Sequence, residues 1–211
     1  YALYETLSGQ RERYPEPFYG ACMNLLGSHD TQRILSCLSD APPKDTLTRE
    51  QQAEYQYKPE AVVRGKRRLY AAFALMFSMP QPPCIYYGDE AGMMGLSDPF
   101  NRGSYPWGRE DPEIRSFVMR LSALRRRNAA LSSGKTAFAA PCADAFAVLR
   151  CRGEESALTL VNRADHAVCA ALGAEDFREG PDALNVRTAD KYSDAFADGT
   201  VLQKDLGTGH I

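Results

Sequence analysis

The sequence lacks the features that would direct it to a membrane, to nucleic acid or to a disulfide framework. No stretch approaches the roughly 18 apolar residues that a membrane span needs, and no signal-peptide pattern opens the chain. Its formal net charge is -2, which does not suit a nucleic-acid-binding surface or an anionic membrane. We therefore expect neither nucleic acid nor a membrane as a partner.

The sequence also lacks closely spaced cysteines, since none of its six cysteines belongs to a CxxC motif. They stand singly among apolar residues: Cys22, Cys37, Cys84, Cys142, Cys151 and Cys169. This pattern predicts small buried side chains rather than metal ligands, and it suits a reducing, cytoplasmic compartment. Because the chain opens at Tyr1 rather than Met, and on a helical pattern, we expect its natural beginning to lie upstream. Export therefore stays open.

What the first part of the chain does contain is an alternation of helical segments and short apolar runs, which predicts a parallel α/β architecture. We expect helices over Tyr1–Tyr14 and Val62–Met79, and strands over Ala21–Leu26 and Pro83–Tyr87. Asp111-Pro112-Glu113 predicts a third helix start, because Asp caps well and Pro suits the first helical position. The segment Ser39–Pro59 reads as irregular, and Gly88–Glu110 as a loop long enough to be functional.

After about residue 134 the pattern changes to alternating strands. These are expected over Phe146–Arg152, Ser156–Asn162 and Ala167–Leu172, and a turn at Asp198-Gly199 predicts another hairpin before Thr200–Leu206. We therefore predict two domains. Residues 1–133 form an α/β unit, and residues 134–211 form a small antiparallel β-sandwich.

Polar residues follow both predicted strands of the α/β unit. His29-Asp30 has three interpretations: a helix-capping Asp beside a bonded His, the HD pair of a metal-dependent phosphohydrolase, or a sugar-cleaving carboxylate. The second requires further His and Asp ligands on other helices. It is disfavoured because the other histidines, His166 and His210, lie in the β-rich part. Parallel strand ends would bring Asp30 and Glu90 to one face of the sheet.

The long loop supplies Asp98 and Arg102 together with the aromatic residues Phe100, Tyr105 and Trp107. Polar forks beside aromatic faces suit sugar recognition, although aromatic residues also pack loops against a fold. From the residues alone, both roles remain open for Trp107.

Segments NLLGSHDTQR (Asn24–Arg33), MPQPPCIYYGDEAGM (Met79–Met93) and DPFNRGSYPW (Asp98–Trp107) resemble consecutive regions of the α-amylase family of glycoside hydrolases, above all its neopullulanase, cyclomaltodextrinase and α-glucosidase branch. Their order and spacing are similar as well. The resemblance implies that residues 1–133 are the C-terminal part of a catalytic (β/α)8 TIM barrel, holding strands seven and eight. It implies that residues 134–211 are the family's C-terminal β-sandwich domain.

The resemblance also implies roles for particular residues. Asp30 matches the catalytic carboxylate that stabilises the transition state, and His29 matches the histidine that binds the same sugar ring. Arg33, Asp98 and Arg102 match positions that bind substrate. The family's nucleophile and acid/base come from strands that would precede Tyr1, so we expect the 211 residues alone to be inactive.

The partner implied is an α-glucan: a malto-oligosaccharide, a cyclodextrin or a pullulan-like glucan. No cofactor is expected in this segment, and calcium in the parent protein stays open. Self-association through an exposed barrel edge is a further hypothesis. Two alternatives remain: a non-catalytic binding or scaffold protein of the same family, and a carbohydrate-binding sandwich with a helical appendage.

Overall fold

The computed structural model describes residues 2–164, 166–168, 172 and 174–177. The chain divides into two compact units. The helix–loop unit comprises Met23–Phe77 and Gln81–Ala123, and the sheet unit comprises the described residues outside these segments. The predicted domain boundary after residue 133 stays a prediction.

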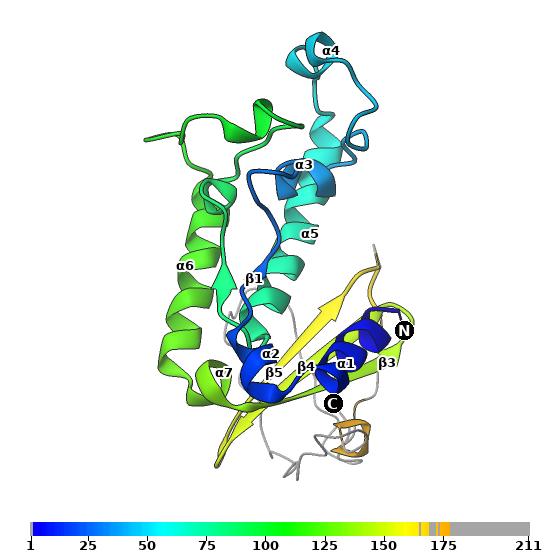
Figure 1. The fold of residues 1–211 in the computed structure, drawn as a ribbon, viewed down its shortest axis with the longest axis vertical. Coiled ribbons are helices and arrows are strands. Elements are labelled where there is room, and N and C mark those ends of the chain that lie inside the picture. The colour runs from blue at the N-terminus through cyan, green and yellow to red at the C-terminus, as the bar shows by residue number, and fades with distance from the viewer. Residues whose placement is uncertain (1, 165, 169–171, 173, 178–211) are drawn as a thin grey trace. The chain divides into compact units, whose positions relative to one another are not determined.

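The helix–loop unit contains two very short parallel strands (Figure 1). β1 (Asn24–Leu25) pairs with β2 (Pro83–Cys84), with Asn24 opposite Pro83 and Leu25 opposite Cys84. Both strands lie where the apolar runs predicted them, but each is shorter than expected. Parallel pairing places the carboxyl ends of both strands at the same edge, so the loops that follow them begin side by side.

Two long helices, α5 (Pro59–Ser78) and α6 (Pro112–Arg127), confirm the predicted helices and supply the core of this unit. The buried side chains recur at helical spacing: Leu69, Phe73 and Met76 on α5, and Ile114, Val118 and Leu121 on α6. The rings of Tyr70 and Phe117 lie 4.8 Å apart between the two helices. Asp111 caps α6 as predicted, since its Oδ1 accepts hydrogen bonds from the N–H groups of Glu113 and Ile114.

Two short helices lie between β1 and α5. α3 (Ile34–Leu38) covers residues for which no element was predicted, and α4 (Arg49–Ala53) lies within the segment Ser39–Pro59 that was predicted to be irregular. α4 has a capping box, in which Thr48 Oγ1 accepts from Gln51 N–H and Gln51 Oε1 accepts from Thr48 N–H. This reciprocal capping explains how so short a helix forms.

The sheet unit contains α1 (Ala2–Arg13), α2 (Glu16–Ala21), α7 (Ala129–Ser133) and a 3₁₀ turn, η3 (Ala174–Phe177). α1 confirms the first predicted helix. α2 lies between the predicted helix Tyr1–Tyr14 and the predicted strand Ala21–Leu26, and it includes the first residue of that strand. Pro17 lies near the start of α2, where a fixed φ favours helix initiation.

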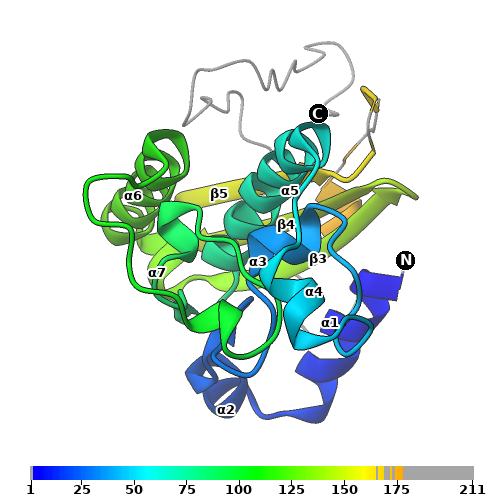
Figure 2. The ribbon, with the colours of Figure 1, turned by 90° about the horizontal axis from the view of Figure 1, so that it is seen from above.

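A three-stranded antiparallel sheet runs through this unit in the order β3–β4–β5 (Figure 2): β3 (Lys135–Cys142), β4 (Ala145–Arg152) and β5 (Glu155–Asn162). β4 and β5 confirm two predicted strands, whereas β3 was not predicted. Of the expected strand Ala167–Leu172, residues 167, 168 and 172 are described and do not lie in a strand. Residues 169–171, the turn at Asp198-Gly199 and the segment Thr200–Leu206 lie outside the described residues, so the sandwich stays a prediction.

Alternating residues of the sheet form its core. Ala137, Ala139, Ala147 and Leu149 are buried together with Leu172 and Phe177. Arg150 is 1% exposed and donates hydrogen bonds to the carbonyls of Ser78 (2.8 Å) and Gly134 (2.9 Å).

The prediction of buried cysteines was wrong for the described residues. Cys22 and Cys37 are exposed, while Cys84, Cys142 and Cys151 are partly buried. Cys22 directly follows α2 and Cys37 lies on α3. An apolar neighbour in sequence does not share a face with a cysteine when the segment is a short surface helix. All five of these thiols are free.

Candidate functional site

Two loops emerge from the ends of the paired strands. The β1 loop (residues 26–33) carries His29 and Asp30, and the β2 loop (residues 85–111) carries Asp98 and Arg102. The parallel register of β1 and β2 starts both loops at one edge of the sheet. This edge is where the sequence predicted the functional residues to meet.

Four of the predicted site residues form one chain of surface contacts. His29 Nε2 lies 3.3 Å from Asp30 Oδ1, and Arg102 Nη2 lies 4.0 Å from the same oxygen. Arg102 Nε in turn donates to Asp98 Oδ1 at 2.9 Å. The Asp30 side chain is 73% exposed. Exposed ion pairs contribute little to stability, so these contacts leave Asp30 available to a ligand. The roles assigned to these residues stay predictions.

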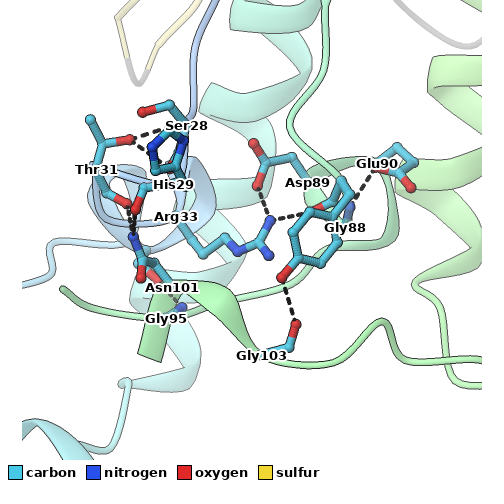
Figure 3. Close-up of polar contacts among 12 residues, drawn as sticks. Ser28, His29, Thr31, Arg33, Gly88, Asp89, Glu90, Gly95, Asn101 and Gly103 are labelled. Carbon is cyan, nitrogen blue, oxygen red and sulfur yellow. Dashed lines mark hydrogen bonds and ion pairs between the residues drawn. The ribbon is translucent and has the colours of Figure 1, made fainter. Parts of the chain in front are cut away.

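Arg33, the fifth predicted site residue, is 1% exposed. Its Nη1 donates to Asp89 Oδ1 at 3.1 Å and to the carbonyl of Tyr87. The guanidinium also lies 4.3 Å and 4.6 Å from the ring centroids of Tyr86 and Tyr87, a favourable cation–π distance. Figure 3 shows Arg33 reaching from the β1 loop to the turn of Gly88 and Asp89. In the structure this side chain joins the two loops, and its contact with substrate stays a prediction.

Asp89 completes this junction from the β2 loop. Burial raises the pKa of its carboxyl to about 6, although the Arg33 guanidinium acts in the opposite direction. At neutral pH the carboxylate is therefore ionised in the folded state. Gly27 of the β1 loop lies so close to the Asp89 carboxylate that a Cβ on residue 27 would be 2.5 Å from Asp89 Oδ2. The loops consequently fit together only because residue 27 has no side chain.

The turn at the start of the β2 loop is stabilised by a hydrogen bond to one of its own acidic side chains. Gly88 has φ +86°, a left-handed conformation that favours glycine. Glu90 Oε2 accepts a hydrogen bond from the N–H of Gly88 at 2.8 Å. Both Asp89 and Glu90 are thus engaged within the loops that present Asp30.

Sequence reasoning missed Asn101, a buried residue of the 3₁₀ turn η2 (Phe100–Arg102). Its Nδ2 donates hydrogen bonds of 2.8 Å to the carbonyls of both His29 and Thr31. Its place between Asp98 and Arg102 was the one available signal. Asn is common in loops for local reasons, so this signal does not distinguish a long-range bond.

Aromatic residues of the β2 loop remain outside the core. Trp107 is 80% exposed, and its ring lies 4.5 Å from that of Tyr105. Of the two roles left open for Trp107, packing of the loop is disfavoured by this exposure. The pair presents an apolar face to solvent of the kind that stacks on sugar rings.

Within the part of the chain that the structure describes, no group of three or more His, Cys, Asp or Glu side chains is arranged to hold a metal ion. None of the described helices combines the length and apolar character needed to cross a bilayer. The expectations about cofactors and calcium stay predictions.

The chain is similar to known enzymes in sequence and in fold. It is 42% identical over 123 residues, 58% of its length, to the amylopullulanase of Thermoanaerobacter thermohydrosulfuricus. It is 31% identical over 159 residues, 73% of its length, to the cyclomaltodextrinase of Geobacillus thermopakistaniensis. A solved structure of cyclic α-maltosyl-(1→6)-maltose hydrolase from Arthrobacter globiformis, in complex with that sugar, matches 77% of this chain with 29% identity and a TM-score of 0.61. No protein-family model matches.

These similarities confirm the resemblance expected from the three motifs: the chain is homologous to part of enzymes of the α-amylase family, which are TIM-barrel glycoside hydrolases. Its relatives within that family carry the names amylopullulanase, cyclomaltodextrinase and maltogenic amylase. The chain spans 8% and 23% of the first two relatives and 32% of the solved hydrolase. Each comparison therefore concerns a limited part of those enzymes.

Proposed function

We propose that this chain supplies the last two β/α units of the barrel of a retaining glycoside hydrolase that acts on α-glucosidic bonds. The substrates proposed are malto-oligosaccharides, cyclodextrins and pullulan-like glucans. The observation that carries the proposal is the contact chain from His29 through Asp30 and Arg102 to Asp98, at the carboxyl ends of two parallel strands. The solved relative bound to a cyclic maltosyl sugar supports the substrate class.

In this proposal Asp30 stabilises the transition state. Cleavage of a glycosidic bond develops positive charge on the sugar ring, and a fixed carboxylate beside that ring lowers the barrier electrostatically. His29, 3.3 Å from Asp30, is placed to hydrogen-bond a hydroxyl of the same ring. Asp98 and Arg102, joined at 2.9 Å, form a polar fork for the neighbouring glucose unit.

The nucleophile and the acid/base are proposed to lie in other strands of the barrel. A retaining glycosidase needs two carboxyl groups about 5 Å apart that act in sequence. Glu90 is not assigned either role, because its carboxylate accepts the Gly88 N–H within its own turn. The 211 residues alone are therefore proposed to lack hydrolase activity, with the full-length protein as the enzyme.

The test is Asp30→Asn in the full-length protein, with kcat measured on maltoheptaose and on a cyclodextrin. We expect kcat to fall by on the order of 10²- to 10³-fold or more. Folding should be unchanged, because the side chain is 73% exposed. Asp144→Asn is the matched control, since Asp144 pairs with Arg163 at 3.1 Å in the sheet unit. Near-unchanged turnover in Asp30→Asn would refute the assignment.

The coding sequence upstream of Tyr1 separates an enzyme from a non-catalytic relative. An Asp and a Glu at the ends of two preceding barrel strands favour hydrolysis, whereas their replacement favours the binding or scaffold protein. Retention of maltoheptaose affinity by Gly134–Ile211 alone would instead favour a carbohydrate-binding sandwich. Cytoplasmic location is part of the proposal and is tested by fractionating the source cells.

Self-association of the isolated chain is also proposed. In the described part of the helix–loop unit, β1 pairs with β2 alone. Exposed apolar side chains lie at β1, where Met23 is 67% and Leu25 45% exposed. A free strand edge beside apolar surface favours pairing with a second copy. Light scattering that shows a monomer at high concentration would contradict this.

A further inference from the structure

The backbone around Asp30 is held from the opposite loop by one buried amide. Asn101 is 1% exposed, and its Nδ2 donates to the carbonyls of His29 and Thr31, both at 2.8 Å (Figure 3). These carbonyls belong to the residues immediately before and after Asp30. The peptide unit that precedes Asp30 and the one that follows Thr31 are therefore both held by a single side chain.

The other contacts of Asp30 are weaker or local. Its side chain lies 3.3 Å from His29 and 4.0 Å from Arg102 on the surface, where ion pairs contribute little to stability. Its N–H donates to Ser28 Oγ, a bond within the same loop. Buried hydrogen bonds are expensive to lose because the partner groups stay desolvated. The direction in which Asp30 leaves the loop is thus set through the backbone rather than through its carboxylate.

Asn101 is itself held in a fixed position. A Cβ at Gly95 would lie 2.2 Å from the carbonyl oxygen of Phe100, so residue 95 must be glycine for these backbones to approach. The carbonyl of Gly95 accepts the N–H of Arg33 at 3.0 Å, and its N–H donates to Ser36 Oγ at 2.8 Å. Gly95 therefore contacts both the backbone of Arg33 and the turn that contains Asn101.

We propose that Asn101 is a positioning residue that aims the carboxylate of Asp30 at the sugar ring. This inference rests on the proposed function. Asn101 acts through the backbone of His29 and Thr31 and does not touch substrate, because it is 1% exposed and its Nδ2 is committed to those two carbonyls. A displacement of about 1 Å at a catalytic group can cost on the order of 10²-fold in rate.

The test is a double-mutant cycle in the full-length protein with Asn101→Ala and Asp30→Asn, in which kcat and KM are measured on maltoheptaose. We expect Asn101→Ala to lower kcat by about 10- to 10²-fold with little change in KM. In the Asp30→Asn background the same change should alter kcat by less than about twofold, because the group that it positions is already lost. An equal loss in both backgrounds would overturn the proposal.

Two further variants separate positioning from loss of fold. Asn101→Asp keeps the shape but loses the donor, so it should reproduce the loss of kcat, and it replaces the alanine variant in the cycle if that variant does not fold. Gln52→Ala removes a comparable bond to the β2 loop, since Gln52 Oε1 accepts from Ser97 N–H at 3.0 Å. Its kcat should stay within about twofold of wild type. A loss as large as that of Asn101→Ala would overturn the proposal.

The two proposals fail in different ways. If the wild-type protein does not hydrolyse α-glucans, or if Asp30→Asn keeps wild-type turnover, the proposed function fails and the positioning role fails with it. If Asp30→Asn loses activity while Asn101→Ala keeps it, only the positioning role is overturned.

Discussion

Each unit of the chain buries an arginine, and the two guanidinium groups bond to different kinds of partner. Arg33 in the helix–loop unit and Arg150 in the sheet unit are each 1% exposed. Arg33 faces the carboxylate of Asp89 and lies against two tyrosine rings. Arg150 donates to the backbone carbonyls of Ser78 and Gly134.

The difference reflects the backbone around each residue. β4 lies between two neighbouring strands, so its own polar groups are satisfied by the ladder and Arg150 is left to serve two carbonyls outside it. Burial lowers the pKa of Arg150 to about 10, and Arg125 acts in the same direction, so the guanidinium is charged at neutral pH. The loops have no ladder, and there a charge pair and the amide of Asn101 hold the backbone instead. The sheet is thus stabilised by the repeated backbone hydrogen bonds of its ladders, whereas the loops of the candidate site are held by a few individual side-chain contacts.

The largest expected effect is that of Arg33→Met. Removing the cation leaves Asp89, 2% exposed, as a buried charge without its ion-pair partner. Breaking a buried pair in this way costs about 3–5 kcal/mol of unfolding free energy, to be measured by urea denaturation at pH 7.5. The double variant Arg33→Met/Asp89→Asn should recover much of the loss. If it is no more stable than the single variant, the charge pair is not what joins the loops.

The second prediction is a pH dependence that Asp89 gives to the helix–loop unit. Because burial raises the pKa of this carboxyl to about 6, the folded state binds the proton more tightly than the unfolded state does. The contribution to stability is complete below about pH 4 and is lost as pH rises through about 6, by on the order of 2 kcal/mol.

The measurement compares unfolding free energies at pH 4.5 and pH 7 for the wild type and for Asp89→Asn. Titration of other groups is common to both proteins, so the difference between them isolates Asp89. A difference that does not change with pH would contradict the prediction.

The smallest expected effect is that of Arg150→Met. This change removes two hydrogen bonds to carbonyls but leaves no opposite charge behind. We expect a loss of about 1–2 kcal/mol, smaller than that of Arg33→Met and unchanged between pH 5 and 7.5. Urea denaturation of both variants side by side decides the comparison. Equal losses would remove the distinction between the two arginines.

Local signals account for the parts of the fold that the sequence predicted. The start of α6 follows from Asp111-Pro112 and the core of α5 from apolar spacing, and both depend only on neighbouring residues. Strand β3 escaped prediction because its sequence, KTAFAAPC, is rich in alanine, which has low strand propensity. Strands β1 and β2 are shorter than their apolar runs, since strand length depends on the partner as well as on the sequence.

The frame of the site depends on contacts between distant residues. The motifs identified His29, Asp30, Asp98 and Arg102, and the structure brings these four together. Asn101 and His29 are 72 positions apart, and Arg33 and Asp89 are 56 positions apart. No local pattern encodes such pairs, so sequence reasoning identified the motif residues, the buried Arg33 among them, and missed Asn101, which bonds the carbonyls of His29 and Thr31.

The missing side chain at Gly27 has a consequence for how this site can change in evolution. With 2.5 Å between a Cβ at that position and Asp89 Oδ2, any larger residue on the β1 loop must be matched by a shorter or displaced one on the β2 loop. The two positions should therefore covary among homologues. A larger residue at position 27 would collide with Asp89 unless position 89 had already become shorter.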